Sequence, residues 1–148
     1  MAVGGSDGRT GYGVCRVRRA TGAVLLLVGL TGGCAGLSAR GADAAAAAEA
    51  FESAVRGGDH AAACFLLAPQ TRSELMESRG AGCAAALGEA RLPAPGARRG
   101  VQVYGRQAMV TFEADTLFLS QFPGSWRVVA AGCVPEPGEP YNCRVKGV

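Results

Sequence analysis

The residues with the clearest chemistry in this sequence are its six cysteines, Cys15, Cys34, Cys64, Cys83, Cys133 and Cys143. A cysteine thiol can be oxidised to a disulfide, bind a metal or carry a covalent group. Structural zinc sites usually contain pairs of cysteines about two to four residues apart. No two of the last four cysteines are that close, so the spacing argues against a metal site.

A short apolar segment precedes Cys34. Three arginines, Arg16, Arg18 and Arg19, stand before the apolar run 23–30. A charged segment followed by about 7–15 apolar residues is typical of a secretory signal peptide, whereas a membrane-spanning helix needs about 20. The sequence therefore predicts a cleaved leader. An uncleaved single-pass anchor is the alternative, because residues 20–39 include no charged residue.

The residues around Cys34 indicate how such a leader would end. Leu30-Thr31-Gly32-Gly33-Cys34 resembles a bacterial lipobox, with its leucine four residues before the cysteine. The resemblance implies cleavage after Gly33 and diacylglycerol on the Cys34 thiol. It divides the chain into a lipoprotein signal peptide (1–33), a lipidated tether (34–42) and a single domain (43–148). The expected location is the outer face of the cytoplasmic membrane, with the membrane itself as a partner.

The net charge of +3 belongs to the predicted leader. The whole chain has 15 Lys and Arg and 12 Asp and Glu; the first 33 residues hold four and one of these, which leaves eleven of each. A nucleic-acid-binding domain normally carries a net positive charge. The neutral remainder therefore predicts no nucleic-acid partner.

Four cysteines remain once Cys15 is assigned to the leader and Cys34 to the lipid. An even number of cysteines in an exported domain indicates disulfides, and four cysteines allow three pairings. We expect Cys64–Cys83 and Cys133–Cys143, because each pair lies within one local stretch of sequence.

The first half of the domain has a helical pattern. Asp43 can cap an alanine-rich helix that Gly57-Gly58 ends, and Asp59 can cap a second helix over 60–67. Thr71 and Glu74 have the spacing of a capping box for a third helix. A fourth helical piece carries Cys83.

The second half has a strand pattern. Strands are expected at 101–103, 108–112, 116–122 and 126–131, with a Pro- and Glu-rich loop at 134–140 before a short edge strand at 141–145. Helices followed by an antiparallel meander predict an α+β domain.

The order of these elements resembles two groups of proteins. Gly57-Gly58-Asp59, the stretch 64–71 (CFLLAPQT) and the stretch 125–133 (SWRVVAAGC) look like small lipoproteins of high-GC Gram-positive bacteria. The order of elements over 43–132 is similar to the cone-shaped nuclear-transport-factor-2-like superfamily, which includes SnoaL-type cyclases and ketosteroid isomerase. That resemblance implies N-terminal helices packed on a curved sheet of four to five strands, with a pocket between them.

A pocket of this kind would be lined by polar or aromatic residues, for which the candidates are His60, Tyr104, Glu113, Asp115 and Trp126. His60 is the single histidine.

The expected function is a non-catalytic binding or interaction domain with an envelope protein as partner and no cofactor. The alternative is a small pocket enzyme of the SnoaL or isomerase type that uses a carboxylate base. A deep cavity with an inward-facing carboxyl group would favour the enzyme, and a filled core would favour the binding domain.

Overall fold

The computed structural model describes residues 33–147. Residues 1–32, which hold most of the expected leader, and the side chain of Cys34 lie outside this description. None of the helices within residues 33–147 is both long enough and apolar enough to cross a membrane.

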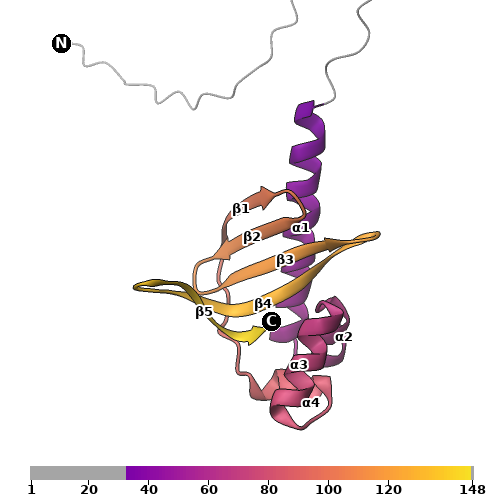
Figure 1. Ribbon diagram of the computed structural model, residues 1–148, viewed down its shortest axis with the longest axis vertical. Helices are drawn as coiled ribbons and strands as arrows, with labels where there is room; N and C mark the ends of the chain where they lie inside the picture. The colour runs from indigo at the N-terminus through magenta and orange to yellow at the C-terminus, as the bar shows by residue number, and fades with distance from the viewer. Residues whose placement is uncertain (1–32, 148) are drawn as a thin grey trace, which may run out of the picture. The chain divides into compact units, whose positions relative to one another are not determined.

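The first helix, α1 (Gly33–Arg56), is longer than predicted. Its expected start at Asp43 is wrong, and residues 34–42 continue the same helix (Figure 1). Long-range contacts of Arg40 stabilise this added part. The Arg40 guanidinium donates hydrogen bonds to the carbonyl of Gly105 and to Oε1 of Gln121, and lies 6.0 Å from the centre of the Trp126 ring.

Three shorter helices follow: α2 (His60–Leu66), α3 (Pro69–Arg79) and α4 (Cys83–Glu89). The predicted cap of α2 is confirmed, because Asp59 Oδ1 accepts a hydrogen bond from the Ala62 N–H at 2.9 Å. The predicted capping box at Thr71 is wrong. Thr71 lies inside α3, is buried, and donates its hydroxyl to the carbonyl of Val129 at 3.1 Å.

Five antiparallel strands follow in the sequential order β1-β2-β3-β4-β5. They are β1 (Arg98–Tyr104), β2 (Gln107–Phe112), β3 (Thr116–Phe122), β4 (Ser125–Glu136) and β5 (Glu139–Lys146). The loop expected at 134–140 is wrong, because the β4–β5 hairpin extends through it with Val134 opposite Asn142. Cys133 and Cys143 face each other in this ladder, which aligns the two strands.

Both disulfides have the predicted pairing. Cys64–Cys83 joins α2 to the first residue of α4, and Cys133–Cys143 joins β4 to β5. The four helices followed by a five-stranded antiparallel sheet confirm the α+β class.

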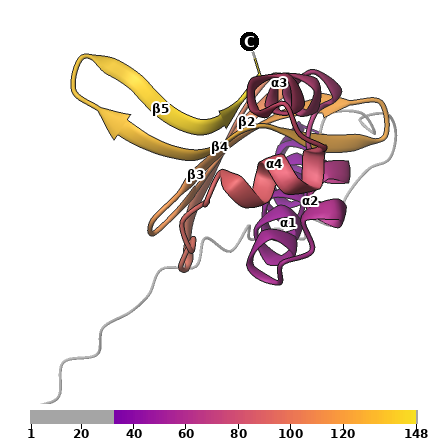
Figure 2. The ribbon, with the colours of Figure 1, turned by 90° about the horizontal axis from the view of Figure 1, so that it is seen from below.

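The helices gather beside the sheet (Figure 2), and the core lies between these two layers. Its largest fully buried apolar side chains come from both layers: Phe51, Leu67, Leu87, Val110, Leu117, Leu119, Val128 and Val145. This filled core fixes α1 and the α2–α3 junction against the strands that carry the candidate sites.

Candidate functional site

The five residues predicted to line a pocket do not form one common site. His60 packs against α4, where a Cβ at Gly88 would come within 3.0 Å of its ring. Tyr104 is 65% exposed and its hydroxyl donates to Oε1 of Gln102. Trp126 is buried in the core. These three side chains therefore have separate structural surroundings.

Glu113 and Asp115 border one shallow cleft but have different partners. Glu113 is exposed, pairs with Arg99 and accepts a hydrogen bond from the Ala97 N–H at 3.1 Å. Asp115 is only 3% exposed and accepts hydrogen bonds from the N–H groups of Gly132 at 3.0 Å and Cys133 at 2.9 Å. Asp115 is thus the one sequence candidate whose carboxyl group is held inside the fold.

The carboxyl group of Asp115 faces a second buried carboxyl group, that of Glu52 on α1. Glu52 is 2% exposed, and no hydrogen-bond donor among the described residues reaches either of its oxygens. Two buried carboxylates in contact would repel each other, so one of them must hold a proton. We call Glu52 and Asp115 the carboxyl pair.

The proton of the carboxyl pair belongs on Glu52. Burial, together with the facing Asp115 carboxylate, raises the pKa of Glu52 from 4.5 to about 8, against an opposing effect of Arg56. Burial also raises the pKa of Asp115, while the N–H groups of Gly132 and Cys133 stabilise its charge. Neutral Glu52 can therefore donate a hydrogen bond to ionised Asp115.

Sequence reasoning missed Glu52, although a signal was present. Ala44, Ala48 and Glu52 follow one another at intervals of four, so the glutamate continues the buried stripe of α1. A charged residue type in an apolar stripe indicates either a paired group or a perturbed pKa.

The clefts beside the carboxyl pair are small. Glu52 borders a cleft of about 150 Å³ together with Glu49, Arg56 and Arg98. The cleft beside Asp115 measures about 280 Å³. Sites for small molecules usually measure about 300–1,000 Å³, so neither cleft provides a deep substrate pocket.

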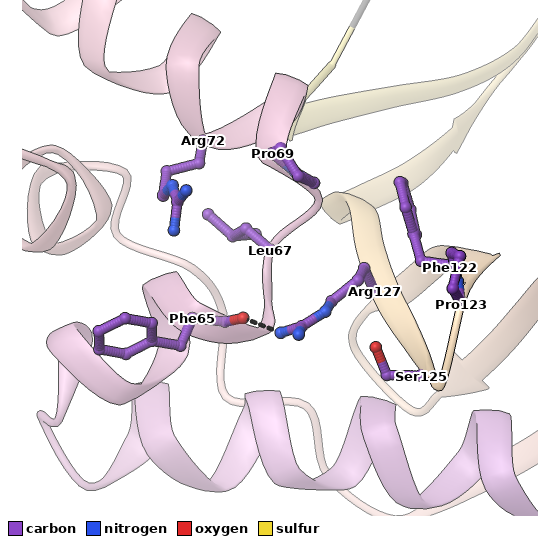
Figure 3. Close-up of a pocket in the computed structure, with 8 residues that line it drawn as sticks. All are labelled: Phe65, Leu67, Pro69, Arg72, Phe122, Pro123, Ser125 and Arg127. Carbon is purple, nitrogen blue, oxygen red and sulfur yellow. Dashed lines mark hydrogen bonds between the residues drawn. The ribbon is translucent and has the colours of Figure 1, made fainter.

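A different concave site lies between the α2–α3 junction and the β3–β4 hairpin (Figure 3). It has a volume of about 330 Å³. We call it the Phe65 groove, and its lining residues are Phe65, Leu67, Pro69, Arg72, Phe122, Pro123, Ser125 and Arg127.

The backbone after α2 positions the Phe65 groove. Leu67 adopts an extended conformation, forms a parallel bridge with Val128 of β4, and is 2% exposed. The Ala68 N–H donates to the Val128 carbonyl at 2.8 Å. The floor of the groove is therefore joined to the sheet, while Phe65 remains on its rim.

The rim combines aromatic and cationic groups. The Phe65 side chain is 70% exposed, and its carbonyl accepts a hydrogen bond from the Arg127 guanidinium (Figure 3). Arg72 is the second cation, and none of the eight lining residues is acidic. This arrangement can bind a ligand that is both apolar and anionic.

Comparison of the chain with protein-family models, curated proteins and solved structures gave no match. Within residues 33–147, no group of three or more His, Cys, Asp or Glu side chains is placed to hold a metal ion. The proposed function is therefore based on the geometry of the groove and of the carboxyl pair.

Proposed function

We propose that this protein is an envelope lipoprotein, attached to the membrane through diacylglycerol at Cys34, whose domain serves as a non-catalytic interaction domain. The exposure of Phe65 is the main observation that supports the interaction role. A large aromatic side chain that is 70% exposed at a concave site costs free energy in water, which a binding partner can recover by covering it.

Two features support export and anchoring. The apolar run 23–30 and the small residues before Cys34 have the order of a lipoprotein leader. Both disulfides suit an oxidising compartment outside the cytoplasm, because thiols in the cytosol are normally kept reduced.

The anchor is tested by replacing the acylated residue. In a bacterial host that processes lipoproteins, Cys34→Ala should abolish incorporation of radiolabelled palmitate and leave unprocessed precursor. Cys15→Ala, in the predicted leader, is the matched control and should be labelled like the native chain. Undiminished labelling of the Cys34→Ala chain would refute the anchor.

The interaction role is tested by photo-crosslinking in intact cells. A benzoylphenylalanine placed at Phe65 should give discrete protein adducts, because that ring faces a bound partner. Tyr104 is the control position, since it is a similarly exposed aromatic residue at the end of β1, outside the groove. Equal adducts from both positions, or none from position 65, would contradict the interaction role.

A pocket enzyme that uses a carboxyl group is the second candidate. The buried Glu52 carboxyl group favours it, because a pKa of about 8 suits proton transfer near neutral pH. The small volume of the adjoining cleft argues against it. We also propose that the fold is cone-like. The packing of the helices beside an antiparallel sheet supports this form.

A further inference from the structure

The two arginines of the Phe65 groove have no acidic partner among residues 33–147 and share one concave site that has no acidic lining residue. Arg98 pairs with Glu49, and Arg99 pairs with Glu113. Among residues 33–147, no Asp or Glu forms an ion pair with Arg72 or Arg127. The groove therefore presents positive charge that the domain itself does not neutralise.

Apolar groups flank these charges on both sides. Figure 3 shows Phe65 and Phe122 on opposite sides of the groove, with Arg127 between them and Arg72 on the side of Phe65. Pro69 and Pro123 are exposed beside them, and Leu67 lies buried at the floor. Aromatic residues and arginine dominate the energetics of protein interfaces, because each combines a large apolar area with directed polar groups.

The size of the groove limits what fits. A volume of about 330 Å³ is at the low end for a small-molecule site and suits a few side chains of a peptide. A guanidinium binds a carboxylate through two parallel hydrogen bonds, which fixes the direction of approach.

We infer that the Phe65 groove binds an acidic segment of a partner protein in which a bulky apolar side chain stands next to Asp or Glu. The apolar side chain packs against the apolar residues that line the groove, and the neighbouring carboxylate binds Arg72 and Arg127. This inference rests on the proposed interaction role and specifies the chemistry of its partner.

An anionic membrane surface is the competing source of negative charge, and the structure favours the peptide. Segments that bind membranes usually combine an apolar face with a clear excess of Lys and Arg. The chain from Cys34 onward has eleven basic and eleven acidic residues, and the two arginines line a hollow rather than a protruding face.

The test uses residues 35–148 with both disulfides formed. This part contains every residue of the described core, from Ala44 to Val145, and both cystines, so it retains what stabilises the fold. The probe is a random peptide library displayed on phage and selected on the immobilised domain. Enriched peptides should carry Asp or Glu within two positions of Phe, Trp or Leu.

The best enriched peptide is then synthesised and its affinity measured. Arg72→Gln should weaken binding roughly tenfold or more, the effect of losing a charged hydrogen bond, and added salt should weaken binding to the native domain. Arg79→Gln is the matched control, because Arg79 lies two turns further along α3 and does not line the groove. It should leave the affinity unchanged.

Three results would overturn the inference: no enriched peptide, enriched peptides without carboxylates, or equal affinity for native and Arg72→Gln domains. Arg72-dependent binding to phosphatidylglycerol vesicles without peptide binding would also overturn it, in favour of a lipid. Adducts at position 65 in cells that persist despite any of these results would preserve the interaction role and exclude only this partner chemistry.

Discussion

At the scale of single residues, the carboxyl pair gives the domain an uncommon dependence on pH. Most carboxyl groups in folded proteins have lowered pKa values and stabilise the fold as pH rises. Glu52 behaves in the opposite way, because its pKa is raised from 4.5 to about 8. Between these two values the unfolded chain releases the Glu52 proton and the folded chain keeps it.

The contribution of Glu52 to stability is therefore fully present at pH values below 4.5 and is lost as pH rises to about 8. Glu52→Gln keeps a neutral side chain of similar shape at every pH. We expect the variant to be more stable than the native domain at pH 8, by roughly 2–4 kcal/mol, with little difference at pH 4.5.

Urea unfolding across this pH range measures the effect. Glu49→Gln is the matched control, because Glu49 lies one turn earlier on α1, is exposed and pairs with Arg98. The control should follow the native pH dependence. If Glu52→Gln also retains the native slope, the proton does not reside on Glu52.

At the scale of elements, Gly132 connects the carboxyl pair to strand β4. Its φ of +66° is in the left-handed region, and a Cβ added there would lie 2.7 Å from Cδ2 of Leu92 and 3.1 Å from Cβ of Arg144. Gly132 also donates its N–H to Asp115. Conformation, close packing and a buried hydrogen bond therefore all depend on this glycine.

Gly132→Ala should consequently destabilise the domain more than an alanine at another glycine with positive φ. Gly138 is the comparison, since its φ is +89° and nothing lies within 4 Å of a Cβ built there. Gly138→Ala reports the conformational cost, and Gly132→Ala should cost about 2 kcal/mol more through overpacking. Equal losses in thermal or urea unfolding would show that the contacts at Gly132 relax freely.

The elements also show which features local sequence determines. The cap of α2 was predictable, because Asp59 and the N–H of Ala62 are three residues apart. The early start of α1 depends on contacts of Arg40 with Gly105 and Gln121, which are distant in sequence. Thr71 lies inside α3 rather than capping it, since its hydroxyl reaches the carbonyl of Val129.

The same distinction explains the sites. The stripe position of Glu52 could have been recognised on α1 alone, but its pairing with Asp115 depends on how the helix packs on the sheet. The Phe65 groove brings residues 65–72 together with residues 122–127, and no local pattern predicts that meeting.

At the scale of the whole molecule, the two disulfides stabilise different layers. Cys64–Cys83 connects two helices across 19 residues, whereas Cys133–Cys143 connects adjacent strands across 10. Removing the first bridge by Cys64→Ala with Cys83→Ala should cost about 3 kcal/mol through chain entropy, and removing the second somewhat less. The β4–β5 ladder also keeps the second pair of cysteines together after the bridge is removed.

Denaturant unfolding of the two double variants compares these losses. The native domain treated with reductant should lose more stability than either variant. A larger loss from the Cys133–Cys143 pair would contradict the loop-length argument and indicate that the hairpin needs its covalent link.

The continuous helix α1 also determines how far the domain can reach. Residues 34–42 span about 13 Å as a helix, compared with about 30 Å for an extended chain. With a lipid at Cys34, this segment acts as a spacer of nearly constant length. The α2–α3 junction lies toward the opposite end of α1 (Figure 1), so the groove would stand at a defined height above the bilayer and meet only partners that extend to that height.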